Sequence, residues 1–253
     1  RLSPCIYANF SLPLHTNIDT TMQDERYLQL LSRKFPNAQA VVSELINLRA
    51  IMSLPKGTEH FVSDLHGEAN AFIHMIKNAS GVIRKKVDEA YGDSLCEEEK
   101  RALCALIYYP DERIELVKKQ HNGQINTPIE EGFEYTTIYE WYKRRLHQVV
   151  AIARAVTIKY SRSKVYKHLP KDYAYVIKEL LHESSLEQKD RQAYYNAIIE
   201  AIIETGCAEQ LLISITYFIH SMAIDTLHIV GDIFDRGPRP HKILDVLSTI
   251  RDY

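Results

Sequence analysis

The chain has few cysteines and no long apolar run. Its 253 residues hold only four cysteines, with no Cys-x-x-Cys pair and no regular disulfide spacing, at Cys5, Cys96, Cys104 and Cys207. This pattern predicts reduced thiols in a cytoplasmic protein. Because no run of about 18 uncharged apolar residues occurs, we expect no transmembrane helix and no membrane partner. The first residues also lack the basic and apolar regions of a signal peptide.

The chain also lacks a strong net charge. Its 31 Lys and Arg residues nearly balance its 33 Asp and Glu residues, which gives a formal net charge of −2. We therefore expect no nucleic-acid partner. Apolar residues make up 45% and charged residues 25% of the sequence, which is near the globular average. A chain of this length can form one large domain or two modest ones.

Two short motifs carry the candidate chemistry. Residues 63–67 read Ser-Asp-Leu-His-Gly and residues 231–237 read Gly-Asp-Ile-Phe-Asp-Arg-Gly. Each motif follows an apolar run, 61–62 or 227–230, that predicts a buried strand, so both lie where open α/β sheets bind ligands. In an extended Asp-x-His, the side chains of Asp64 and His66 point to the same side and can hold one ion. Since Asp232 can share an oxygen with a second ion, the motifs predict a metal site for cutting phosphate esters.

Each motif alone has a simpler explanation. The Asp-x-His-Gly sequence can be a polar strand end, and the second motif can be a charged surface turn with an internal ion pair. The second motif is the more demanding, because glycines at both ends permit tight turns around two acids and an arginine. Their occurrence together, each behind a strand, favours the metal site.

The motif pair resembles the calcineurin-like metallophosphoesterases. The flanking sequences Phe-Pro-Asn-Ala-Gln-Ala (35–40) and Leu-Pro-Lys-Gly-Thr-Glu-His-Phe-Val-Ser-Asp (54–64), with the long gap between the motifs, resemble the class III (Firmicutes-type) fructose-1,6-bisphosphatases of bacteria. The resemblance implies hydrolysis of fructose 1,6-bisphosphate to fructose 6-phosphate and phosphate, a step of gluconeogenesis. Mn²⁺ is the metal it implies, and Mg²⁺ or another divalent cation also suits the ligands.

The resemblance also implies roles for single residues. By position, Asp64 and His66 hold one metal and Asp232 bridges both metals. Asp235 orients a later catalytic histidine, and Arg236 binds the phosphate, so these two are the candidate catalytic residues. The family has a later Gly-Asn-His motif, followed by further histidines that complete the second metal, and no Gly-Asn-His occurs in this sequence. We therefore expect the chain to be the amino-terminal portion of a longer protein and to be inactive alone.

Other histidines are weaker candidates for the missing ligands. We expect four of them to serve as core, strand or solvated residues instead: His74, His220, His228 and His241.

The motifs are separated by 163 residues, 68–230, where a β-α-β crossover needs only about thirty. The intervening pattern predicts helices at 97–109, 111–119, 136–160, 172–183 and 190–206. We therefore expect an α/β fold: a metallophosphoesterase-type sheet from residues 22–80 and 223–253 with a helical insertion at 81–222. Two helices broken at Pro36 should precede the first strand, and residues 1–21 should form an irregular tail.

Two other functions stay open from sequence. A phosphoprotein or dinucleotide phosphatase could carry both motifs, and a catalytically inactive helical module could serve assembly or regulation. The expected partner is a sugar bisphosphate, and an uncovered sheet edge would favour a homo-oligomer. A basic cluster could attract anions, although a solvated helix face is the simpler interpretation of Lys143, Arg144, Arg145, Arg154, Lys159, Arg162, Lys164, Lys167 and Lys171.

Overall fold

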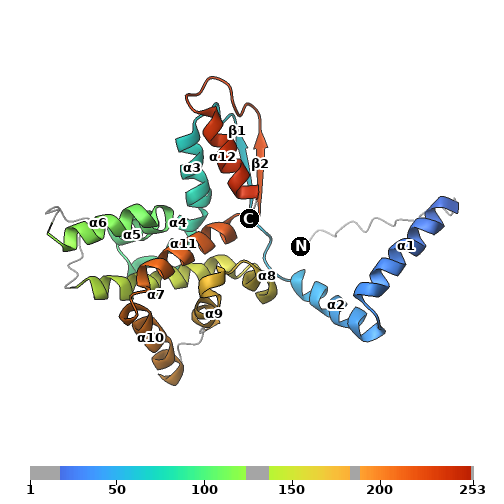
Figure 1. Cartoon of the computed structure of the whole chain (residues 1–253), viewed down its shortest axis with the longest axis horizontal. Helices are drawn as coiled ribbons and strands as arrows, with labels where there is room; N and C mark the ends of the chain where they lie inside the picture. Colours follow the sequence, from blue (N-terminus) through green and yellow to red (C-terminus); the bar gives the residue numbers. More distant parts are fainter. Residues whose placement is uncertain (1–17, 124–136, 183–188, 252–253) are drawn as a thin grey trace, which may run out of the picture. The chain divides into compact units, whose positions relative to one another are not determined.

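The computed structural model describes residues 18–123, 137–182 and 189–251 (Figure 1). The chain divides into two units, and the boundary in the sequence lies between Ser53 and Leu54. Within the described ranges, no helix is both long and apolar enough to cross a membrane.

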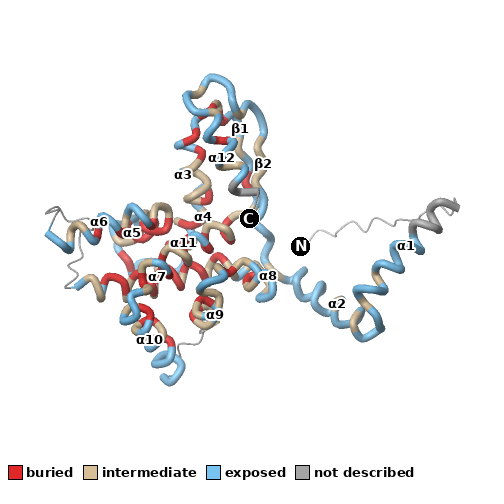
Figure 2. The backbone as a smooth tube through the Cα atoms, viewed as in Figure 1, coloured by how far each residue is buried: buried red, intermediate tan, exposed pale blue. Residues whose placement is uncertain are grey.

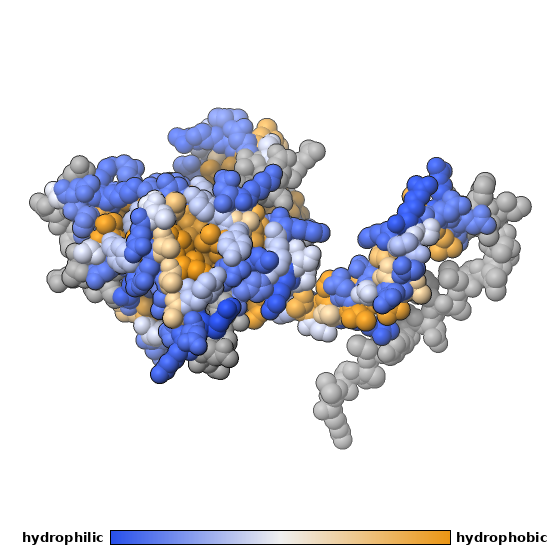
Figure 3. Space-filling model, turned by 60° about the horizontal axis from the view of Figure 1, so that its bottom comes forward, coloured by the Kyte–Doolittle hydropathy of each residue, from blue (hydrophilic) through white to orange (hydrophobic). Residues whose placement is uncertain are grey.

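The first unit consists of two helices, α1 (Ile18–Lys34) and α2 (Ala38–Ile51). The predicted break at Pro36 is confirmed, and the Asn37 side chain caps α2 by accepting a 2.9 Å hydrogen bond from the Ala40 amide. α2 has no buried residue, and its apolar side chains lie on the surface, as the orange patches of Figure 3 show. This unit therefore has no described core of its own.

The second unit contains a parallel pair of strands, β1 (Glu59–Ser63) and β2 (Thr226–Val230). Both lie where the apolar runs predict strands, and Phe61 is opposite His228. Helices α3 (Ala69–Asn78) and α12 (Pro240–Arg251) follow the two strands and contribute to one small hydrophobic cluster, whose buried members are Leu65, Ala69, Phe72 and Ile243. The α/β character of the prediction is thus present in this part of the chain.

The segment between the strands is helical, as predicted. Its helices are α4 (Val82–Tyr91), α5 (Glu97–Tyr108), α6 (Pro110–His121), α7 (Ile138–Thr157), α8 (Arg162–Lys167), α9 (Ala174–His182), α10 (Lys189–Glu204) and α11 (Ala208–Ala223). Short 3-10 helices are η1 (Ala79–Gly81), η2 (Gly92–Ser94) and η3 (Lys171–Tyr173). The helix predicted at 172–183 begins later, because Asp172 lies inside η3 and α9 starts at Ala174, and α4 and α8 were not expected.

Helix α7 lies at the centre of this helical segment and packs against α11 (Figures 1 and 2). Trp141 and Leu146 of α7 are almost wholly buried, with 1% and 0% of their surface exposed. The hydrophobic cluster that they join runs from Ala79 to Ala223 and is separate from the cluster beneath the strands. The helical segment therefore buries its own core. The exact division at residues 81 and 222 stays a prediction.

One ionic cluster ties the helical segment to the start of both strands. The Asp225 carboxylate accepts hydrogen bonds from Lys159 Nζ (2.8 Å), Lys164 Nζ (3.0 Å) and the Thr58 amide (2.8 Å). The Asp225 amide in turn donates to the Thr58 carbonyl at 2.9 Å. Partial burial acts to raise the pKa of Asp225, but the hydrogen bonds from Lys159, Tyr160, Thr58 and Lys164 outweigh burial and hold the pKa well below its usual range.

Candidate metal and phosphate site

The two sequence motifs meet at the carboxyl ends of the paired strands. The His66 amide donates to the Asp232 carbonyl at 3.1 Å, and the Gly67 amide donates to the Ile233 carbonyl at 2.9 Å. Across the same junction, the Asp232 amide donates to Asp64 Oδ1 at 3.3 Å. Backbone hydrogen bonds therefore hold the loops 64–67 and 231–237 together, although more than 160 residues separate them in sequence.

The junction depends on unusual backbone conformations. Asp64, His66 and Arg236 have φ angles of 50°, 46° and 66°, in the left-handed region that non-glycine residues rarely adopt. A Cβ atom added to Gly67 would lie 2.8 Å from the Gly237 Cα. Such conformations cost about 1 kcal/mol or more each and cluster at functional sites. Three of them in two facing loops therefore support the assignment of these loops as a site.

Three candidate ligands converge here. One ligand atom from each of His66, Asp232 and Asp235 lies within 4.8 Å of the other two. Asp64, which the sequence predicts as a ligand, lies outside this group, and its Oδ1 accepts a hydrogen bond from the Asp232 amide. The structure thus brings together two of the three predicted ligands and adds Asp235.

His66 and Asp235 form the closest polar pair of the group. His66 Nδ1 lies 2.8 Å from Asp235 Oδ1, and 34% and 45% of the two side chains are exposed. The hydrogen bond from His66, with smaller contributions from the charges of His66 and Arg236, lowers the pKa of the Asp235 carboxyl. Asp235 is therefore held in its charged form, which is the form that accepts a hydrogen bond from an imidazole or binds a cation.

The donor set fits a divalent cation. The set consists of one imidazole nitrogen and two carboxylates, so most of its ligand atoms are oxygens. Such a set suits Mn²⁺ or Mg²⁺ and does not exclude Fe or Zn. The group offers three protein ligands. Water, substrate or further protein ligands would complete the coordination sphere of an ion bound there.

Arg236 lies beside this group and points toward solvent. Its Nε is 3.2 Å from Asp235 Oδ2, and 79% of its side chain is exposed. Asp235 therefore touches both His66 and Arg236 with its two oxygens. An exposed guanidinium held next to a metal-ligand group can form a bidentate contact with a phosphoryl group.

Four other histidines lie in helices and in a strand, outside the group of candidate ligands. His74 lies in α3, and its Nδ1 is 2.7 Å from the Tyr109 hydroxyl. Burial and the charge of Lys77 lower the pKa of His220, on α11, to about 4. His228 lies within β2 and stacks on Phe61 with ring centroids 4.4 Å apart. His241 lies in the first turn of α12.

Much of the basic cluster is neutralised within the fold. Lys143 pairs with Glu200 at 2.6 Å, Arg144 pairs with Glu99, and Arg145 is buried and donates to Gln148 at 2.6 Å. Lys159 and Lys164 bind Asp225. These pairs favour the structural interpretation of the cluster over an anion-binding surface.

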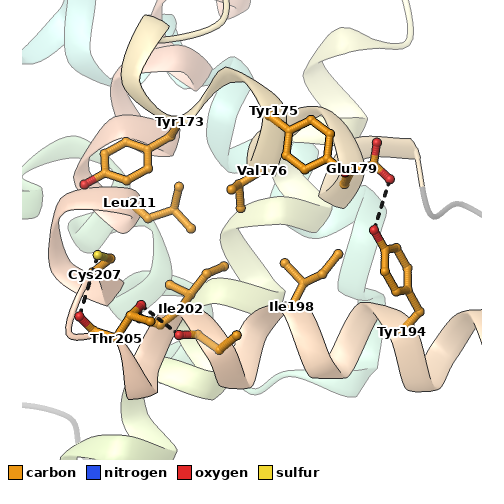
Figure 4. A pocket seen from close by; sticks show the side chains of 11 residues that line it. Tyr173, Tyr175, Val176, Glu179, Tyr194, Ile198, Ile202, Thr205, Cys207 and Leu211 are labelled. Carbon is orange, nitrogen blue, oxygen red and sulfur yellow. Dashed lines mark hydrogen bonds between the residues drawn. The ribbon is translucent and has the colours of Figure 1, made fainter.

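A groove of about 310 Å³ lies in the helical segment, between residues of η3, α9, α10 and α11 (Figure 4). Apolar side chains such as Val176, Ile198 and Ile202 line it, and Tyr194 donates a 3.4 Å hydrogen bond to Glu179 at its rim. No lysine or arginine is among its lining residues. The groove therefore lacks the cations that a sugar phosphate would need.

Sequence reasoning missed the contact between His66 and Asp235, and it missed Arg239. The Arg239 amide donates to the Gly67 carbonyl at 3.2 Å, so its backbone belongs to the loop junction. The one available signal was its place between Pro238 and Pro240, because two prolines restrict the backbone that they flank.

The comparisons with known proteins agree on one family. Its sequence profile, described as Firmicute fructose-1,6-bisphosphatase, matches residues 26–253. Curated proteins named fructose-1,6-bisphosphatase class 3 are similar to the chain. The one from Phocaeicola vulgatus is 47% identical over 235 residues, which cover 93% of the chain and 33% of that protein. The one from Clostridium tetani is 46% identical over 231 residues, covering 91% and 33%.

A third relative, from Porphyromonas gingivalis, is 49% identical over 224 residues, covering 88% of the chain and 32% of that protein. The chain thus spans about a third of the length of the curated relatives that it matches. No solved structure matches the chain.

Proposed function

Because the chain belongs to the Firmicute fructose-1,6-bisphosphatase family, we propose that it supplies part of the active site of a metal-dependent phosphatase. The reaction is the hydrolysis of fructose 1,6-bisphosphate to fructose 6-phosphate and phosphate. The observation that carries the proposal is the junction of the two loops, which places His66, Asp232 and Asp235 within 4.8 Å of one another. The proposal includes a metallophosphoesterase-type fold, a role in gluconeogenesis and a cytoplasmic location.

The first part of the proposal concerns the metal. Asp64, His66 and Asp232 would hold a divalent cation, with Mn²⁺ as the expected ion. When bound, such a cation neutralises phosphoryl charge and lowers the pKa of a water ligand. Asp64 accepts the Asp232 amide with Oδ1 at 3.3 Å, and its second carboxylate oxygen, Oδ2, would be the atom that binds the ion.

Asp235 positions His66 in this proposal. When Asp235 accepts the Nδ1 proton of His66, the Nε2 lone pair is left free to bind a cation. The lowered pKa of Asp235 keeps the carboxylate charged for this task. A partner of this kind fixes both the tautomer and the ring orientation of a ligand histidine.

Arg236 would bind the phosphoryl group that is transferred. Its guanidinium is exposed and is held 3.2 Å from Asp235, so it can make a bidentate contact with two phosphoryl oxygens without losing its anchor. The same contact would stabilise the charge that builds up on these oxygens during transfer.

A chimera tests the proposal. Residues of this chain would replace the matched 235 residues of the Phocaeicola vulgatus relative, and phosphate release from fructose 1,6-bisphosphate would be measured with Mn²⁺. We expect turnover that Asp232→Asn abolishes and that Asp172→Asn, an exposed acid in η3, leaves unchanged. The 253-residue chain alone should release little phosphate, because the proposed site has only three protein ligands, Asp64, His66 and Asp232.

A substrate panel gives the contrary outcomes. Turnover of phosphopeptides or dinucleotides in preference to fructose 1,6-bisphosphate would replace the sugar phosphatase with one of the alternative phosphatases. A folded chimera that hydrolyses none of them would leave the assembly or regulatory function as the better explanation.

A further inference from the structure

Arg239 is held rigidly at the edge of the candidate site. Its amide donates to the Gly67 carbonyl at 3.2 Å, and its carbonyl accepts a 3.2 Å hydrogen bond from the Lys242 amide. Pro238 precedes it, and Pro240, the first residue of α12, follows it. A residue before proline strongly favours extended conformations, which together with these two backbone hydrogen bonds restricts the position from which the Arg239 side chain starts.

The Arg239 side chain has no function within the described fold. The residue is exposed, and within residues 18–123, 137–182 and 189–251 its guanidinium forms no ion pair. Arg236, by contrast, is already anchored on Asp235 at 3.2 Å. A guanidinium on a fixed backbone loses less entropy when it binds a ligand than one on a flexible loop.

A bisphosphate substrate needs a second positively charged side chain at this site. The loops carry three carboxylates, Asp64, Asp232 and Asp235, and a bound metal with Arg236 would serve only the phosphate that is cleaved. A sugar bisphosphate brings a second phosphate, which needs its own donor. The backbones of Arg236 and Arg239 are three residues apart and so at most about 11 Å from each other, a spacing on the scale of one hexose with its substituents.

We propose that Arg239 binds the second phosphate of the sugar bisphosphate, the one that is not cleaved. It is then the residue by which the site prefers bisphosphates to monophosphates. This inference rests on the proposed function, since it takes the phosphate beside Arg236 to be the reacting one. Guanidinium suits the task because its planar fork matches two phosphate oxygens.

Ligand binding to the 253-residue chain tests the inference directly. Calorimetry with Mn²⁺ present would compare fructose 1,6-bisphosphate with fructose 1-phosphate, which lacks the second phosphate. We expect the unaltered chain to bind the bisphosphate about tenfold more tightly, the preference that one charge-assisted contact supplies. Arg239→Gln should remove this preference and leave the affinity for fructose 1-phosphate unchanged.

Two further variants separate the possible causes. Arg236→Gln should weaken the binding of both ligands, because it touches the phosphate that they share. Arg162→Gln, the same change at an exposed arginine of α8, should alter neither. Circular dichroism would verify that each variant keeps its helix content.

The outcomes distinguish this inference from the function on which it rests. Equal affinity of the unaltered chain for the two ligands, or a preference that survives Arg239→Gln, would overturn the role of Arg239 and leave the phosphatase standing. Failure of the chain to bind either ligand would count against both. In the chimera, Arg239→Gln should raise KM for the bisphosphate about tenfold and leave kcat almost unchanged, whereas an equal fall in kcat would contradict a role in binding alone.

Discussion

His66 and Asp235 lie 169 positions apart in the sequence, and a 2.8 Å contact joins the imidazole Nδ1 of the first to a carboxylate oxygen of the second. Each residue comes from a different motif, so this contact joins the two loops through side chains, in addition to the backbone hydrogen bonds between them. It also makes Asp235 a neighbour of a metal ligand as well as of Arg236. A substitution in either loop should therefore change the position of side chains in the other.

The three-ligand group should bind one Mn²⁺ weakly. Titration calorimetry of the 253-residue chain should give a stoichiometry near one, because the proposed ligands Asp64, His66 and Asp232 suffice for one ion, and the described residues contain no candidate ligand group apart from the one at this junction. Asp232→Asn should abolish the binding signal, and Asp172→Asn should preserve it. Tight binding of two ions per chain would show that other side chains complete a second site.

Gly237→Ala should disrupt the junction of the loops. A Cβ at this position would overlap the His66 carbonyl oxygen and the backbone of Gly67, so the loops must separate. We expect a fall of at least about tenfold in Mn²⁺ affinity, the scale of effects from positioning groups.

Gly92→Ala is the matched control for this change. Its Cβ would meet open space, although its φ of +47° strains any side chain, so the expected cost is about 1 kcal/mol of stability with Mn²⁺ affinity retained. Equal Mn²⁺ binding by the two variants would show that the contact at Gly237 does not hold the site.

Lys159→Met should destabilise the second unit. Only 10% of the Lys159 side chain and 15% of the Asp225 side chain are exposed. Among the described residues, loss of the lysine leaves this largely buried carboxylate with Lys164 as its one charged partner. We expect the free energy of unfolding to fall by about 1–3 kcal/mol, measured by urea denaturation. Lys167→Met, at an exposed position of α8, should change it little, and a comparable loss in both variants would argue against the Asp225 cluster.

The half-buried His220 should make stability depend on pH. Burial and the charge of Lys77 lower the pKa of His220 to about 4, whereas in the unfolded chain it is near 6.5. Between these values the unfolded chain binds the extra proton, so the free energy of unfolding should fall as the pH falls from 6.5 to 4, by about 2–3 kcal/mol. His220→Gln should flatten this slope, and His241→Gln should leave it in place. An unchanged slope in His220→Gln would assign the pH dependence to other groups.

Local patterns in the sequence predicted most elements. The apolar runs before each motif are β1 and β2, the break at Pro36 separates α1 from α2, and the helix predicted at 190–206 is α10, with Gly206 (φ +74°) just beyond its end. These features depend on neighbouring residues. The short helix α8 has too few apolar positions for a periodic pattern. Asp172 lies in the 3-10 helix η3 and not in α9.

The site could be predicted in its residues but not in its contacts. Sequence placed Asp64, His66 and Asp232 behind strands, yet an extended Asp-x-His was wrong for the backbone, since Asp64 and His66 adopt φ angles of 50° and 46°. The partners that impose this bend come from the other loop, through the hydrogen bonds to Asp232 and Ile233. A contact between distant segments leaves no local pattern, and the pair of His66 with Asp235 is of this kind.

The ionic cluster at Asp225 has a consequence for the order in which the chain folds. Thr58 and Asp225 are 167 positions apart, and joining the ends of so long a loop costs about 4–5 kcal/mol of chain entropy. Two five-residue strands cannot offset that cost alone, whereas the helical core between them brings their first residues together as it forms. The metal and phosphate loops should therefore assemble last, and pulse-labelled hydrogen exchange during refolding should detect protection in α7 and α11 before it appears in β1 and β2.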